Sequence, residues 1–194
     1  MSEVQSNFHL KPGVRVPDFS LPDAYGKVFS RAEVAGSNGL LVVFACNHCP
    51  YVIHLATALG EVAREIELSG VRTVAINSND SEQYPLDGPE LMKTFATSHR
   101  WDFPYLIDVT QEVAIAYAAA CTPDFFLADG AGRLVYSGQF DHTRPRSGQA
   151  ADGGDLREAV RRMLAGEIAS LLISRMAVPV LYYMARRGKF QGPA

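Results

Sequence analysis

The segment Cys46-Asn47-His48-Cys49 constrains the fold of this chain more than any other. It follows an apolar run at residues 40–45, which has the length and composition of a buried β-strand. It precedes residues 51–69, where apolar side chains recur at helical spacing. Two cysteines at this strand-to-helix junction are expected to share the first helical turn, where backbone N–H groups lower a thiol pKa below its free value of ~8.5. The motif therefore predicts a redox-active dithiol on an α/β scaffold.

The rest of the chain predicts the layers of that scaffold. Core strands are expected at residues 40–45, 71–76, 104–107, 124–128 and 133–137. Helices are expected at residues 51–69, 89–99, 108–119 and 155–165. Residues 14–30 resemble a hairpin ahead of the core, and Asp129-Gly130-Ala131-Gly132 is a hairpin turn between the last two strands. Helices between strands cover both faces of a sheet, so we predict an α/β fold with a mixed central sheet sandwiched by helices.

Composition bounds the class of protein. The 194 residues suffice for one domain with a full core, and 47% of them are hydrophobic. The net charge of −3 gives no support for nucleic-acid binding. Residues 1–12 lack the apolar segment of a secretory signal, and three cysteines are too few for a disulfide scaffold. We therefore expect a cytoplasmic protein with reactive rather than structural thiols.

The order of elements, with a C-x-x-C pair after the first core strand and Thr122-Pro123 before the late hairpin, resembles the thioredoxin fold. The opening of the chain is similar to that of the AhpC/TSA-type peroxiredoxin branch, and the stretch from Phe44 to Gly138 resembles an uncharacterised redoxin group of that branch with a C-N-H-C-P motif. The segments that carry the resemblance are Pro17-Asp18-Phe19, residues 44–52, residues 74–80, residues 103–106 and residues 121–127. The resemblance implies a thioredoxin-like redoxin domain at residues 1–166 with an N-terminal β-hairpin extension.

The resemblance also implies roles for the motif. In thioredoxins the first cysteine is exposed and attacks a disulfide, and the second resolves the mixed disulfide. Cys46 would then be the attacking thiol and Cys49 the resolving one. His48 either stabilises a thiolate by charge or hydrogen bonding, or is an exposed side chain without a partner. Inert thiols or a metal clip are the alternatives, but a C-x-x-C motif in a βαβ context favours redox chemistry.

Thr122-Pro123 matches the position of the cis-proline that faces the redox pair in thioredoxin-like proteins. The resemblance implies a cis bond here and a substrate-binding role for both residues, because neighbouring backbone groups can pair with an extended substrate. Cys121 lies two residues before the proline, and backbone alternation turns it away from the face that Thr122 presents. We expect a buried, inert thiol at Cys121, with a third redox thiol as the alternative.

Two features of the related families are missing. Residues 40–45 are entirely apolar, so the buried acid that thioredoxins carry on this strand is absent or comes from another segment. Peroxiredoxins carry Thr or Ser three residues before a peroxide-attacking Cys-Pro, whereas here Cys46 precedes Cys49-Pro50. A thiol is a weak hydrogen-bond donor, which weakens a peroxidase interpretation. The polar loop at residues 77–80 could reach the active-site end of the sheet, although a solvated loop is the simpler expectation.

Three functions are compatible with these residues. The first is a thiol–disulfide oxidoreductase that uses the Cys46/Cys49 pair. The second is a thiol peroxidase with Cys49 peroxidatic and Cys46 resolving. The third, a Cu(I) or Zn module built from these cysteines with His48 and Cys121, is less favoured. We expect no metal and no cofactor, and as partners protein or small-molecule disulfides and a thiol reductant or oxidant.

The last 28 residues, 167–194, form an apolar and basic tail that is not an independent domain. The apolar stretch is too short and too charged to span a membrane. We expect it to pack on the domain or on a second copy, which would form a homodimer. A basic amphipathic segment lying on an anionic membrane is the alternative.

Overall fold

The computed structural model describes residues 10–166. The predictions made for the tail, including the homodimer and the membrane surface, fall outside these residues. Among the described residues, no helix is long and apolar enough to cross a membrane.

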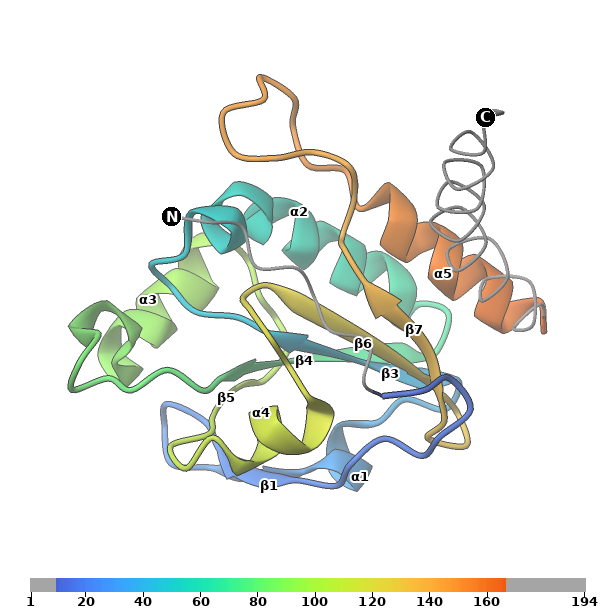
Figure 1. The fold of residues 1–194 in the computed structure, drawn as a ribbon, viewed down its shortest axis with the longest axis horizontal. Helices are drawn as coiled ribbons and strands as arrows, with labels where there is room; N and C mark the ends of the chain where they lie inside the picture. Colours follow the sequence, from blue (N-terminus) through green and yellow to red (C-terminus); the bar gives the residue numbers. More distant parts are fainter. Residues whose placement is uncertain (1–9, 167–194) are drawn as a thin grey trace, which may run out of the picture.

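A five-stranded mixed sheet forms the centre of the fold (Figure 1), as the pattern of elements predicts. Its strands lie in the order β5-β4-β3-β6-β7. Their bounds are β3 Gly39–Phe44, β4 Val71–Asn77, β5 Tyr105–Ile107, β6 Asp124–Asp129 and β7 Leu134–Gly138. β4 runs parallel to both β3 and β5, whereas β6 is antiparallel to β3 and to β7. The hairpin expected at the end of the sheet is therefore β6–β7.

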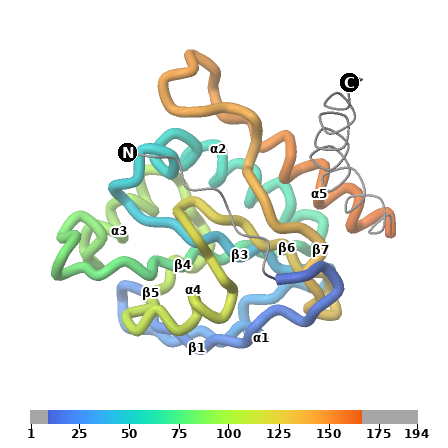
Figure 2. The backbone as a smooth tube through the Cα atoms, viewed as in Figure 1, coloured from blue at the N-terminus to red at the C-terminus, as the bar shows by residue number. Residues whose placement is uncertain are grey.

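Helices and the N-terminal segment cover the two faces of this sheet (Figures 1 and 2). One face carries α2 (Pro50–Glu67) and α5 (Gly154–Leu164), and α3 (Pro89–Ser98) adds Met92 to the same cluster. The other face carries α1 (Arg31–Val34), α4 (Glu112–Tyr117) and the antiparallel hairpin of β1 (Ser20–Pro22) and β2 (Val28–Ser30). A short 3-10 helix, η1 (Pro85–Asp87), precedes α3. The predicted sandwich and its N-terminal hairpin are both present.

The central strand β3 explains why residues 39–44 are continuously apolar. All six of its residues are buried. Leu41 and Val43 pack into the cluster beneath α2, while Leu40 and Val42 pack into the cluster on the opposite face. A strand buried on both faces has no polar side to alternate with, so the pattern of period two is lost.

We predict that Leu41→Ala lowers the free energy of unfolding by about 2–5 kcal/mol, because it leaves a cavity in a fully buried site. Urea unfolding followed by circular dichroism measures this loss. Leu68→Ala, at a leucine that is 91% exposed, is the matched control and should change stability by less than about 0.5 kcal/mol. Equal effects of the two substitutions would contradict this assignment of the core.

Candidate active site

The loop between β3 and α2 carries the cysteine motif. Cys49 is the N-cap residue of α2, and Pro50 follows at its first helical position. Proline suits that position because its backbone needs no N–H donor there and its φ angle is already helical. Cys46 lies before the helix begins. The expectation that both cysteines share the first helical turn is therefore wrong, and only Cys49 lies at the positive end of the helix.

The exposure of the two sulfurs also differs from what the thioredoxin resemblance implied. Cys46, expected to be the exposed thiol, is buried at 1% exposure. Cys49 is the more accessible residue of the pair. The reason is the path of the chain, because Cys46 directly follows the buried β3 and Ala45, whereas Cys49 has reached the rim where the helix starts.

Thr122 contacts both sulfurs from the loop before β6. Its Oγ1 lies 3.2 Å from Cys46 Sγ, and its carbonyl oxygen accepts a hydrogen bond of 3.1 Å from the Cys49 thiol. The Thr122–Pro123 peptide bond is cis, which agrees with the expectation for this position. The substrate-binding role expected for Thr122 and Pro123 is thus compatible with their location beside the pair.

The two thiols have opposite acidities. The hydrogen bond from Cys46 lowers the pKa of Cys49 to about 5, and the backbone N–H groups of Val52 and Tyr51 stabilise the same thiolate. The pKa of Cys46 is raised above its ordinary value, first because its proton is held in that bond and then because the thiol is buried. The Thr122 carbonyl opposes ionisation of Cys49, since only the protonated thiol can donate to it. The helix N-terminus outweighs this, so we assign the thiolate to Cys49.

Cys121 is half-buried rather than fully buried, so the expectation of a buried thiol is wrong. Its Sγ lies 3.8 Å from the carbonyl oxygen of Pro123, on the same loop. All three cysteines are free thiols in this structure.

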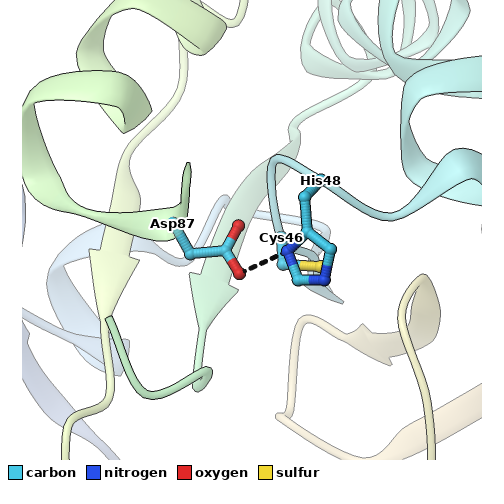
Figure 3. Close-up of side chains that lie close together, drawn as sticks. All are labelled: Cys46, His48 and Asp87. Atoms are coloured by element: carbon cyan, nitrogen blue, oxygen red, sulfur yellow. Dashed lines mark hydrogen bonds and ion pairs between the residues drawn. The ribbon is translucent and has the colours of Figure 1, made fainter. Parts of the chain in front are cut away.

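His48 has a partner that the sequence did not reveal. Its Nδ1 lies 2.7 Å from Oδ2 of Asp87, whose side chain is completely buried (Figure 3). The ring also stacks on Tyr84, with the centroids 5.1 Å apart and the planes 10° from parallel. The alternative in which His48 is exposed and without a partner is therefore wrong.

The Asp87 carboxylate joins two loops at the carboxyl edge of the sheet. Its Oδ1 accepts the backbone N–H of Asn47 at 2.7 Å, and its Oδ2 accepts Nδ2 of Asn79 at 2.8 Å. Asn77 donates to the Asp87 carbonyl oxygen. The loop after β4 thus belongs to the site, and the simpler expectation of a solvated loop is wrong for Asn77 and Asn79. In the sequence, the only sign that this loop reaches the site is its position after a parallel strand. Nothing in the sequence marks Asp87, rather than Asp80, as the residue that contacts the site.

Cys46, His48 and Asp87 bring one donor atom each to within 4.8 Å of one another (Figure 3). Such a set raises the question of a metal. Both oxygens of Asp87 already accept N–H groups, one of them from the imidazole itself. An ion between His48 and Asp87 would have to replace that bond, so the arrangement fits a hydrogen-bonded acid–base pair better than a ligand set.

Comparison with known proteins gives the family. The AhpC/TSA family model matches residues 12–137. The chain belongs to the AhpC/TSA family. A curated relative from Mycobacterium tuberculosis is named "Putative peroxiredoxin Rv2521". It is 28% identical to this chain over 110 residues, which are 57% of this chain and 65% of that protein. The chain thus spans less than two thirds of the length of this curated relative.

Two solved structures are more similar to this AhpC/TSA chain. A hypothetical protein from Sinorhizobium meliloti is 46% identical with a TM-score of 0.80, and covers 84% of this chain and 89% of its own. An uncharacterized conserved protein from Geobacillus kaustophilus is 44% identical with a TM-score of 0.81, over 86% and 88% of the two chains. Peroxidoxin BcpB from Mycobacterium tuberculosis, at 19% identity and a TM-score of 0.61, covers 81% of this chain and 98% of its own and shares the fold. The fold is thioredoxin-like.

We predict that Cys49 is alkylated by iodoacetamide with a half-maximal rate near pH 5, because its pKa is lowered to about 5. Cys46→Ala removes the largest stabilising contact and should move this midpoint upward, toward the ~8.5 of a free thiol. Mass spectrometry of the Cys49 peptide over a pH series measures both midpoints. Cys121→Ala is the matched control and should leave the midpoint near 5, while a wild-type midpoint above 8 would contradict the assignment of the thiolate.

Proposed function

We propose that this AhpC/TSA protein is a thiol–disulfide oxidoreductase that cycles Cys46 and Cys49 between dithiol and disulfide. One observation carries the proposal: the accessible Cys49 has its pKa lowered to about 5 at the start of α2, beside a buried and protonated Cys46. A thiolate is the nucleophile in disulfide exchange, and a second thiol in contact with it completes the exchange. The roles are therefore the reverse of those implied by the thioredoxin resemblance, with Cys49 attacking and Cys46 resolving.

The proposed cycle balances as two exchanges. The Cys49 thiolate attacks one sulfur of a substrate disulfide, a mixed disulfide forms, and the first substrate thiolate leaves. Cys46 then loses its proton and attacks Cys49 Sγ, which forms the Cys46–Cys49 disulfide and releases the second substrate thiolate. The pair loses two electrons and the substrate gains them. A dithiol reductant returns the pair to its starting state, and the same steps run backwards oxidise a partner.

Thr122 and Pro123 support a disulfide carried on an extended chain. They lie on the loop that contacts both sulfurs, and a peptide alongside a backbone segment of this kind can form main-chain hydrogen bonds. We infer that protein or peptide disulfides are the substrates. We also propose that the protein acts in the cytoplasm, because three cysteines, two of them at redox spacing, suit reactive rather than structural thiols.

A thiol peroxidase is the second candidate, and the Cys49-Pro50 pair at the start of α2 favours it within this family. The Cys49 thiolate would take one oxygen from a peroxide ROOH, which leaves Cys49 as a sulfenic acid and releases ROH. Cys46 would then condense with the sulfenic acid to form the disulfide and water. Cys46 in place of a hydroxyl residue supplies only a weak donor to the peroxide, so we rank this reaction second.

We predict that Cys49→Ser abolishes the reduction of insulin disulfides, with a loss of at least about a hundredfold, because a serine hydroxyl is not ionised near neutral pH. Cys46→Ser should also stop turnover but accumulate a mixed disulfide on Cys49. Turbidity measures turnover, and mass spectrometry detects the adduct. Cys121→Ser is the control and should keep turnover within about twofold of the parent. Full turnover by the Cys46→Ser variant would remove the proposal.

The two candidates separate in one further assay. With Cys46→Ser protein and a stoichiometric alkyl peroxide, a peroxidase should yield a sulfenic acid on Cys49 that dimedone traps. An oxidoreductase specific for disulfides should yield no adduct while still forming the mixed disulfide with insulin. Rapid peroxide consumption coupled to a dithiol donor would promote the second candidate over the first.

A further inference from the structure

Asp87 carries a buried carboxylate that has no role in the dithiol cycle as described so far. Its side chain has no solvent exposure, yet it sits at the centre of the site and accepts three N–H hydrogen bonds. Two of the donors, the Asn47 backbone and Asn79, hold the carboxylate in place. The third is the imidazole of His48. A carboxylate that is held in this way fixes the orientation and tautomer of the histidine bonded to it.

The resolving step requires the removal of a proton from Cys46, and the His48–Asp87 pair can accept it. Cys46 must become a thiolate before it can attack, but it is buried and its pKa is raised. Formation of the mixed disulfide removes the negative charge on Cys49, while burial and the nearby charge of Asp87 still oppose ionisation of Cys46. The rate of the second exchange therefore depends on a proton acceptor beside the Cys46 sulfur.

His48 has the geometry of that acceptor. Its Nδ1 donates to Asp87, so the neutral ring keeps a lone pair on Nε2. One donor atom from each of Cys46, His48 and Asp87 lies within 4.8 Å of the other two, so a ring nitrogen of His48 is within that distance of the Cys46 sulfur (Figure 3). A gap of this size is closed by a small rotation of the ring or spanned by one water molecule. The His48 side chain is 32% exposed, so it can exchange the proton with solvent or with the departing thiol.

We propose that the His48–Asp87 pair accepts the proton of Cys46 in the resolving step, with His48 as the base and Asp87 as its positioning residue. The inference rests on the proposed function, because it assigns a proton path to the second exchange of that cycle. The Cys46 S–H bond breaks, and its proton moves to the imidazole. The S–S bond to Cys49 forms, and the bond from Cys49 to the substrate sulfur breaks. The imidazolium, paired with Asp87, then returns the proton to the released substrate thiolate.

The charges around His48 favour this direction. Asp87 disfavours a bare thiolate at Cys46, whereas a ring that has taken the proton is positive and lies close to both anions, so their charges attract. Tyr84 stacks on the ring, and Cys49 follows His48 in the chain at the start of α2. Tyr105, whose hydroxyl donates to Asn47, has its pKa raised by burial and stays protonated.

A chromogenic disulfide separates the two exchanges. Dithiobis(nitrobenzoate), mixed with reduced protein in a Cys121→Ser background, should release one nitrothiobenzoate when Cys49 attacks and a second when Cys46 resolves. Stopped-flow absorbance records the two phases. We expect His48→Gln and Asp87→Asn each to slow the second phase by about tenfold or more while the first phase changes by less than about threefold. His54→Gln is the matched control, at a histidine on α2 that bonds to Thr143, and should change neither phase.

The pH profile distinguishes a proton acceptor from a merely structural residue. Without His48, the second phase should depend on the Cys46 thiolate alone and rise by about tenfold per pH unit into the alkaline range. At alkaline pH it should approach the wild-type rate. Because Asp87→Asn changes a buried group, His48→Gln decides the matter if the former does not fold. A second phase of unchanged rate and pH dependence in folded His48→Gln protein would overturn the proton path but leave the redox cycle intact, whereas loss of the second phase in wild-type protein would overturn the proposed function itself.

Discussion

The site depends on the burial of β3 on both faces. Because β3 and β4 are parallel, their carboxyl ends meet at the same edge of the sheet, and the segments that follow both strands begin there. The first of these carries the cysteine motif, and the second carries Asn77, Asn79 and Asp87. The hydrogen bonds from Asn47 to Asp87 and to the Leu86 carbonyl tie the two loops together. The hydrophobic core thus decides which polar groups become neighbours.

The chemistry depends on a difference between two sulfurs that are close in space. Cys49 is at the N-terminus of α2, where the helix stabilises negative charge, while Cys46 is enclosed by the strand end and by Thr122. The same bond between them lowers one pKa and raises the other. In the proposed cycle, one thiol is therefore ready to react while the other keeps its proton until the first has reacted. The carboxylate of Asp87 adds to this difference because it lies near Cys46.

The sequence predicted the layers of the fold well because hydrophobic periodicity records burial directly. The apolar runs predicted the buried strands β3 and β4, and the helical spacing of apolar residues predicted the buried face of α2. The cis bond at Thr122–Pro123 came from family resemblance. The placement of Cys46 on the first turn of α2 was wrong because helix starts are poorly determined by sequence. A shift of this kind changes which sulfur the helix stabilises. Asp87 was missed because its burial follows from contacts with residues 8 to 40 positions away, which no local pattern encodes.

The three asparagines around Asp87 have a consequence for how the molecule fluctuates. Asn47 comes from the segment after β3, and Asn77 and Asn79 come from the end of β4 and the loop beyond it. Neither segment can swing outward without leaving a buried anion short of donors, which is costly in a medium of low polarity. The two segments therefore open as one cooperative unit, and their amide hydrogens should exchange with solvent in concert.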